Sequence, residues 1–412
     1  MQFTAKSAKL LSIQEPELWP DPPSRMSVSL LRELESCPKR WALNSANYPQ
    51  LWELYGYPRP LNLAALEGIV IHSVIELIVR EMSVGNCSTL EDRNAIDVMR
   101  RLGGNTGIIK NSIEGALDSY LCNPRSSHKL AEANHRLINR TAEIRSLIQM
   151  HLSRIRFVSS SPLSGSSKHN RGLSNGCYTE VELRARELGW LGITDLLTIS
   201  DDYCEIRDFK TGVPKEQHCF QLQVYALLWQ QDFDLNPAGR LIDRLIISYN
   251  NREVEISAPG FEELMSLRDE LLKRTEAVIR SARTLPPQAF PEKGKCPCCS
   301  VRHLCNDYWN LQRQSQILQK GPQGQVFSDL QIRLIRRHGP TSWDGEIEIC
   351  PVLVPGETVL LRMPSFSTID VESGMRVRIL DALIKTPLPE TSISQAQKSV
   401  ATLGDYSEVF TL

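Results

Sequence analysis

The sequence predicts an α/β domain with a large helical insertion, followed by a smaller β-rich domain. Apolar residues recur at steps of three and four over residues 63–156, which is typical of helices. Two short runs rich in β-branched and aromatic residues, 190–199 and 203–210, are typical of strands. After the turn-forming residues 321–324, short strand-like runs replace the helical pattern. A chain of 412 residues is long enough for about two domains.

The first part of the chain is expected to be mainly helical. Residues 1–25 are rich in proline near their end and should form an irregular lead-in. Residues 26–43 are predicted to form a helix that ends in a Cys-Pro segment. The helical insertion at 63–156 follows, with a break at the Gly-Gly-Asn of residues 103–105. Residues 159–176 are rich in serine and glycine and should form a flexible loop.

The central part combines strands with helices. The strand runs at 190–199 and 203–210 are followed by a run with helical character at 219–230. Residues 244–257 are predicted to form a second hairpin, and residues 261–284 an amphipathic helix that leads to a cysteine-rich segment.

The C-terminal residues 325–412 are predicted to be β-rich. The strand-like runs are 346–354, 358–363 and 375–384. About 80 residues of short strands favour a small barrel or sandwich, with an OB-like barrel as the first choice. Such a barrel would bind single-stranded nucleic acid, with Trp343 and Phe366 as stacking side chains. The alternative is a domain for packing or for docking a partner.

The first candidate site lies on the two central strand runs. If Asp201 and Asp202 form a two-residue hairpin loop, Asp195 lies across from Asp208, with Cβ atoms about 4.5–5.5 Å apart. Strand alternation then places Lys210 on the face of Asp208. Two carboxylates this close repel each other unless a cation lies between them, and Mg²⁺ is the expected occupant. The metal would polarise a phosphodiester while the lysine orients or helps to deprotonate the attacking water.

A polar pair follows this site at helical spacing. Gln221 and Tyr225 are four residues apart, so both lie on one face of the predicted helix. An isolated pair of this kind would be ordinary surface residues beside an apolar stripe. Because the pair begins only nine residues after Gly212, it is expected to belong to the site.

The order of these motifs resembles the PD-(D/E)xK nucleases of the RecB type, a family that includes AddB-like recombination proteins and CRISPR-associated single-chain nucleases. The resemblance covers about residues 26–310 and implies a mixed sheet flanked by helices. The matching segments are, in order, Ser27-Val28-Ser29-Leu30 leading to Cys37-Pro38-Lys39-Arg40-Trp41, Gly68-Ile69-Val70-Ile71-His72, Gly192-Ile193-Thr194-Asp195, Asp208-Phe209-Lys210-Thr211-Gly212, Gln221 with Tyr225, and a closing cysteine cluster.

The resemblance assigns roles to the site residues. It implies that His72, Asp195 and Asp208 bind Mg²⁺ or Mn²⁺, together with the backbone carbonyl of Phe209, and that Lys210 is the catalytic lysine. Taken alone, His72 would be an ordinary core histidine on an apolar helix.

Further roles follow from the same resemblance. Gln221 and Tyr225 would position the substrate strand. Either Glu180 or Glu182 would match an additional acidic position, and the sequence leaves the choice between them open.

The second candidate site is a set of cysteines. Cys296, Cys299 and Cys305 have the spacing C-x2-C-x5-C, and Cys37 lies far upstream. By resemblance to the iron–sulfur members of the family, these four would hold a 4Fe-4S cluster. Four thiolates also suit zinc. A cluster here would act as a staple that closes a loop of about 260 residues.

Alternatives for this set stay open at the level of the sequence. Zinc could recruit His303, and Cys298 could replace Cys299 as a ligand. Four buried thiols without a ligand are a further interpretation. The other six cysteines show no spacing pattern, and an odd total of 11 argues against a secreted disulfide framework. Without an apolar N-terminal run or a stretch of about 18 apolar residues, a cytoplasmic protein with no membrane partner is expected.

The charge balance gives no global signal for nucleic acid, because the formal net charge is −1. Two local basic groups could provide a path for a strand, although each could also be an ordinary solvated face. They are Arg25, Arg32, Lys39 and Arg40, and Arg333, Arg336 and Arg337. No phosphate-binding loop motif is present, so unwinding of duplex DNA would need a helicase or another DNA-processing partner.

Together, these patterns predict a metal-dependent DNA nuclease. The expected activity is exonuclease action on single-stranded ends, in DNA repair or recombination or in phage or CRISPR defence. The alternative is a catalytically weak or inactive DNA-binding or assembly subunit of a larger complex. Crowding two carboxylates beside a lysine argues against that alternative, and Asp208→Ala distinguishes the two.

Overall fold

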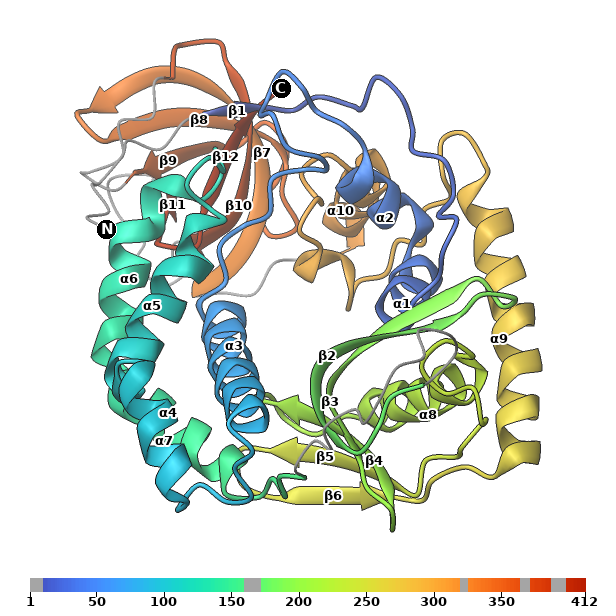
Figure 1. Cartoon of the computed structure of the whole chain (residues 1–412). Helices are drawn as coiled ribbons and strands as arrows, with labels where there is room; N and C mark the ends of the chain where they lie inside the picture. The colour runs from blue at the N-terminus through green and yellow to red at the C-terminus, as the bar shows by residue number, and fades with distance from the viewer. Residues whose placement is uncertain (1–9, 159–171, 319–324, 364–370, 387–397) are drawn as a thin grey trace.

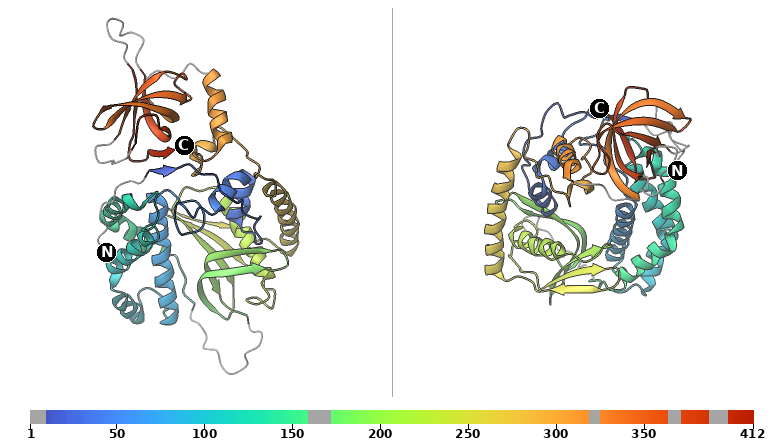
Figure 2. Two further views of the ribbon diagram at one scale, coloured as in Figure 1. Left: turned by 90° about the horizontal axis from the view of Figure 1, so that it is seen from above. Right: turned by 180° about the vertical axis from the view of Figure 1, so that it is seen from behind.

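A computed structural model describes residues 10–158, 172–318, 325–363, 371–386 and 398–412. Two sheets organise these residues, one of five strands and one of seven (Figure 1). Helices surround the five-stranded sheet, and the seven-stranded sheet lies at one end of the molecule (Figure 2). The loop expected at 159–176 falls mostly outside the described residues.

The five-stranded sheet has the order β2-β3-β4-β5-β6. Among the described residues, β4 and β5 form its only parallel pair, so the sheet is mixed, as predicted. Helix α8 makes the crossover between these two strands and packs its apolar side chains on the sheet. The elements are β2 (Gly176–Ala185), β3 (Trp190–Ile199), β4 (Cys204–Lys210), α8 (Glu216–Gln231), β5 (Arg244–Tyr249) and β6 (Glu253–Ile256).

The β3–β4 hairpin has the register that the two-residue loop predicts. Ser200 N donates to Tyr203 O across the turn, at 2.9 Å. The paired residues run from Ile199 with Cys204 to Leu196 with Arg207. The ladder ends there, one pair short of Asp195 and Asp208. The two strands therefore separate where the carboxylates lie, which leaves room between them.

The helical insertion covers the other side of the sheet (Figure 1). Its long helix packs against Leu196 and Phe209 of the strands through residues such as Ile71 and Ile75. Gly103 and Gly104 have φ of +83° and +70°, and they separate two helices at the predicted break. The helices are α3 (Leu63–Val84), α4 (Arg93–Arg101), α5 (Gly104–Asp118), α6 (Leu130–Asn139) and α7 (Thr141–Leu152), with a 3₁₀ turn at Ser127–Lys129.

The prediction of one helix at 26–43 is wrong, because two helices occupy this segment. These are α1 (Val28–Ser36) and α2 (Pro38–Ser45). Cys37 between them is extended, with φ −172° and ψ 106°. A proline disfavours helical geometry in the residue before it and is well suited to the first position of a helix. The break turns the Cys37 side chain into the cap of α2, where its sulfur accepts from Arg40 N at 3.4 Å.

Five strands of the C-terminal sheet close into a barrel, because β10 pairs with both β11 and β7. The order around the barrel is β7-β8-β9-β11-β10, and β9 and β11 are parallel. Two short strands, β12 and β1, extend it beside β10. The strands are β1 (Leu11–Ser12), β7 (Gln325–Gly339), β8 (Ser342–Ile349), β9 (Thr358–Arg362), β10 (Arg376–Lys385), β11 (Ser399–Thr402) and β12 (Glu408–Thr411).

The stacking residues expected on this barrel are not supported. Trp343 is 8% exposed and belongs to the barrel core, so it cannot stack on a base, and that prediction is wrong. Phe366 lies outside the described residues.

Buried arginines join the barrel to the rest of the protein. Arg125, in the insertion, forms two 2.6 Å hydrogen bonds to the carboxylate of Glu408 on β12. Arg302 lies 2.6 Å from Asp329 on β7 and also donates to Asp381 on β10. Helices α9 (Phe261–Ala282) and α10 (Asn306–Leu318) precede the barrel.

Candidate active site and cysteine pocket

The structure brings His72, Asp195, Asp208 and Lys210 together at the point where β3 and β4 separate. His72 Nδ1 of α3 lies 3.5 Å from Asp195 Oδ2. The same Asp195 oxygen accepts from Phe209 N at 2.6 Å. Lys210 Nζ lies 2.6 Å from Asp208 Oδ2. Asp208 and Lys210 therefore share one side of their strand, as alternation predicts.

Burial sets the charges of this group. Burial first, and then the Asp195 charge, raise the pKa of Asp208 to about 7, against the opposing effect of Lys210. Burial also opposes ionisation of Asp195, but the hydrogen bond and charge of His72 outweigh it and lower the Asp195 pKa. The His72 pKa is raised, because its bond to Asp195 outweighs burial. Two carboxyl groups thus differ in their affinity for a proton within one site.

Gln221 and Tyr225 lie beside this group on α8. Gln221 Nε2 donates to the Tyr225 hydroxyl at 2.7 Å, and Tyr225 is buried. The Tyr225 ring packs on Gly192 of β3, where an added Cβ would meet Tyr225 Cε1 at 2.6 Å. The glycine of the Gly-x-x-Asp motif is therefore required by the close approach of this ring.

The acidic residue beside the carboxylates is Glu180, and Glu182 is turned to another partner. Thr179 pairs with Leu196 and Val181 with Thr194, so Glu180 is across from Asp195. Burial and then the Asp195 charge raise the Glu180 pKa. Glu182 pairs with Ile193 and forms an ion pair with Arg184.

The sequence analysis did not identify His151 and Asn250, which contact Phe209 and the segment after Lys210. His151 is buried, with its ring edge-to-face on Phe209 at 5.4 Å between centroids. Its Nδ1 lies 3.0 Å from Ser248 Oγ and its Nε2 lies 3.3 Å from Asn250 Oδ1. Asn250 Nδ2 donates to Thr211 O at 3.1 Å, which holds the segment after Lys210. Only the position of Asn250 in a predicted hairpin signalled it in the sequence.

The chemistry of the carboxyl groups fits a divalent cation. Asp208 is buried, the Asp195 charge contributes to its raised pKa, and its Oδ2 lies 2.6 Å from the Lys210 ammonium. Carboxylate oxygens are the ligands that Mg²⁺ prefers. Among the described residues, no group of three His, Cys, Asp or Glu side chains is already arranged to hold a metal ion. The Lys210 ammonium lies where a cation would neutralise Asp208.

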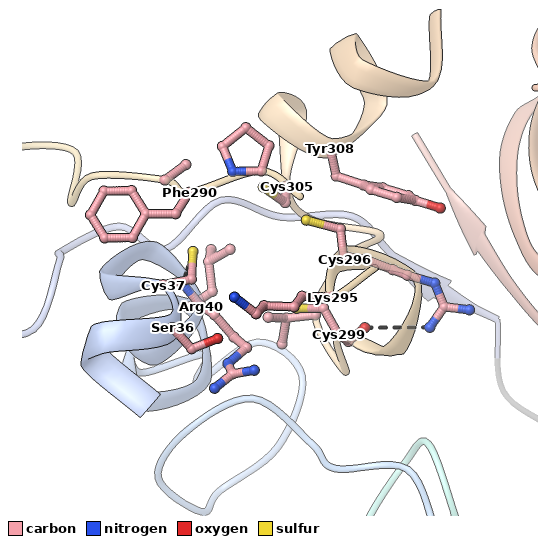
Figure 3. A pocket seen from close by; sticks show the side chains of 14 residues that line it. Ser36, Cys37, Arg40, Phe290, Lys295, Cys296, Cys299, Cys305 and Tyr308 are labelled. Atoms are coloured by element: carbon pink, nitrogen blue, oxygen red, sulfur yellow. Dashed lines mark hydrogen bonds between the residues drawn. The ribbon is translucent and has the colours of Figure 1, made fainter. Parts of the chain in front are cut away.

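The second candidate site is a pocket lined by all four predicted cysteines. Cys37, Cys296, Cys299 and Cys305 line it with Arg40 and Lys295 (Figure 3). Cys37 and Cys296 accept from backbone N–H groups at 3.4 and 3.2 Å. Cys299 and Cys305 accept from the backbone of Val301 and Tyr308. Such N–H donors stabilise thiolate ligands and tune a cluster.

The two alternative ligands lie elsewhere. Cys298 is exposed and does not line the pocket. His303 is fully buried and stacks on Phe410, with ring centroids 3.8 Å apart, so it is not placed to replace a thiol. The 11 cysteines, all within the described residues, are free thiols.

The predicted basic groups are largely engaged in pairs. Lys39 lies 2.5 Å from Asp307. Arg333 pairs with Glu346, and Arg336 lies 2.8 Å from Asp344 across the β7–β8 hairpin. Arg337 donates to backbone carbonyls of the same hairpin. Lys39 is mostly buried, whereas Arg333 and Arg336 are exposed on the β7–β8 hairpin.

Comparison with known families decides the assignment. The profile of the PD-(D/E)XK nuclease superfamily matches residues 25–306, well over half of the chain. The chain belongs to the PD-(D/E)XK nuclease superfamily. Members are nucleases that generally use divalent metal ions such as Mg²⁺, and DNA is the substrate that the family implies. The match includes every candidate site residue named above and ends before the barrel.

Other comparisons add little. Curated protein sequences give no match. Among solved structures, the crystal structure of SSO0001 has 17% identity and a TM-score of 0.23, over 47% of this chain and 81% of that one. A murine DNA binding protein bound to double-stranded DNA has 12% identity and a TM-score of 0.16, over 40% and 61%. No conclusion follows from scores this low. No described helix is both long and apolar enough to cross a bilayer.

Proposed function

We propose that this PD-(D/E)XK protein is a Mg²⁺- or Mn²⁺-dependent deoxyribonuclease that acts as an exonuclease on single-stranded ends. The observation that supports it most is the buried Asp208, which lies 2.6 Å from the Lys210 ammonium and within electrostatic reach of Asp195. Two carboxylates and a lysine where two strands separate suit hydrolysis of a phosphodiester. Repair, recombination and defence against phage all supply such ends.

Each residue has a proposed part. Asp195, Asp208 and His72, with the Phe209 carbonyl, would hold the metal, which when bound neutralises the phosphate and lowers the pKa of water. Lys210 orients the attacking water, because its ammonium already lies at the edge of the carboxylate group. The Gln221–Tyr225 pair positions the strand, and its internal hydrogen bond fixes both side chains in advance. The Asp195 charge contributes to the raised pKa of Glu180, so the two carboxyl groups lie within electrostatic reach of each other.

We also propose that the cysteine pocket holds a 4Fe-4S cluster. Four thiols from α2 and the 296–305 segment line one pocket, each with a backbone N–H donor. The position of His303 away from this pocket favours an all-cysteine site, and zinc bound by four thiols is the remaining alternative. The closed barrel with a parallel β9–β11 pair supports an OB-like C-terminal domain.

The test is cleavage of single-stranded and duplex DNA, labelled at either end, by anaerobically purified protein with Mn²⁺. Asp208→Ala should abolish cleavage. Asp202→Ala changes an exposed aspartate of the hairpin that carries Asp208 and should retain it. The ladder of products reports polarity. If cluster-loaded protein cleaves none of these substrates, the chain is instead a binding or assembly subunit, and a helicase or other DNA-processing partner should be sought.

A further inference from the structure

A cleft with apolar and charged lining lies between the end of β4 and the C-terminal barrel. Thr211 and Gly212, directly after Lys210, form part of its wall. Lys129, Arg136 and Arg140, from α6 and its flanks, form another part, and Tyr406 of the β11–β12 turn completes it. The nuclease core, the insertion and the barrel thus each contribute to one cleft, and α6 lies below the barrel in Figure 1.

The cleft carries three basic side chains at helical spacing, and the carboxylates of Glu67, Glu132 and Asp405 also line it. Residues 129, 136 and 140 lie on one face of the α6 region, since they are separated by seven and four positions. Arg136 pairs with Glu132 and lies 3.6 Å from Asp405, and Arg140 pairs with Glu67. These arginines are 42% and 54% exposed. Exposed ion pairs of this kind contribute little to stability, so a phosphate can take the place of the carboxylates.

The cleft also offers an aromatic surface. Tyr406 is 71% exposed, so its ring is accessible to a ligand. Its hydroxyl lies within hydrogen-bonding reach of Arg136, so the ring is held beside that arginine. Gly212, two residues after Lys210, lines the cleft, and nothing stands within 4 Å of where its Cβ would be. Stacking on an aromatic ring beside cations is how proteins bind single strands without regard to sequence.

We propose that this cleft binds the single DNA strand next to the scissile phosphate, with Tyr406 stacking on a base and Lys129, Arg136 and Arg140 contacting phosphates. The inference rests on the proposed nuclease function for the identity of the strand. It gives the barrel a part in substrate binding through one turn, and it makes the helical insertion a guide for the strand.

Binding can be tested apart from catalysis. The probe is a fluorescein-labelled oligothymidylate of 20 nucleotides, titrated into Asp208→Ala protein as the common background. Tyr406→Ala should weaken binding at least about fivefold, and Tyr406→Trp should restore it. Replacing Arg136 and Arg140 together by glutamine should lower the slope of log affinity against log salt by about 1.4.

Matched controls lie in another surface hollow with similar chemistry. Phe233 is 67% exposed there, and Arg268 lines the same hollow. Phe233→Ala and Arg268→Gln should leave binding unchanged. The inference is overturned if Tyr406→Ala binds as the background does, or if the control variants weaken binding equally. If binding depends on Tyr406 but the wild-type protein cleaves no DNA, the role of the cleft in binding is supported and the proposed catalysis is rejected. The two proposals can therefore fail separately.

Discussion

Gly192→Ala should damage the site without touching a charged residue. The new methyl group would stand 2.6 Å from Tyr225 Cε1, whereas ordinary contacts begin at 3.4 Å, so the ring must retreat by about 0.8 Å. Leu228 Cδ1, at 2.9 Å, is the end of a flexible side chain and can give way more easily. Overpacking of this kind lowers the free energy of unfolding by about 1–3 kcal/mol.

The functional loss should exceed the loss of stability. Tyr225 is held by Gln221, and displacement of a positioning group by about 1 Å can lower the rate by roughly 100-fold. Chemical unfolding and cleavage of labelled single-stranded DNA measure the two effects. Gly115→Ala is the matched control, because nothing lies within 4 Å of that position in α5 and alanine favours a helix.

A second substitution separates the proposed cause from a general defect. Tyr225→Ala removes the ring that the new methyl group would meet. In that background, Gly192→Ala should cost far less stability than in the wild type, and a double-mutant cycle measures the difference. Equal losses in both backgrounds would refute the reasoning, as would a Gly192→Ala protein with normal stability and normal cleavage.

Four further predictions concern the charged groups and the thiols. Because burial raises the pKa of Asp208 to about 7, a proton must leave before a metal binds, so calorimetry should find Mn²⁺ binding tighter at pH 8 than at pH 6. Between about pH 4 and pH 7, Asp208 is protonated in the folded, metal-free protein and ionised in the unfolded chain, so the free energy of unfolding should fall as the pH rises through this range. Asp208→Asn should remove this pH dependence. A variant that kept it would contradict the assignment to Asp208. Glu408→Ala leaves the buried Arg125 without its carboxylate and should lower the free energy of unfolding by about 3 kcal/mol, measured by chemical unfolding. Asp234→Ala, in the exposed pair with Arg186, is the control and should lower it by at most about 0.5 kcal/mol. Equal losses in the two variants would contradict this prediction. Cys299→Ala should remove iron and visible absorption from anaerobically purified protein while Cys298→Ala retains both, and loss in both variants would reopen the choice of ligand.

Local signals made the central hairpin predictable. A Ser-Asp-Asp turn between two apolar runs fixes a two-residue loop, and the loop fixes the register of the ladder up to Leu196 and Arg207, the pair next to Asp195 and Asp208. The Gln221–Tyr225 contact follows from helical spacing alone. The cysteine spacing brought Cys296, Cys299 and Cys305 together, and only the family pattern pointed to Cys37.

Other features lacked such signals. β2 was not predicted. Glu180 interrupts its regular strand geometry with a φ of +50°, and nothing in the sequence indicates that conformation at a glutamate. β7 was missed because Arg333, Arg336 and Arg337 interrupt its apolar pattern, although each is satisfied at the β7–β8 hairpin. The Tyr406 cleft joins segments that are far apart in sequence, so no local pattern reports it.

The pairing of β1 with β12 has a consequence for how the protein forms. Leu11 pairs with Phe410, so about 400 residues must be synthesised before this contact can close. Until then, β1 is an unpaired edge that can recruit other chains. The barrel consequently completes last and holds an early segment in place. A shortened chain that stops before residue 408 should therefore aggregate more readily during expression, even though its nuclease core contains every catalytic side chain.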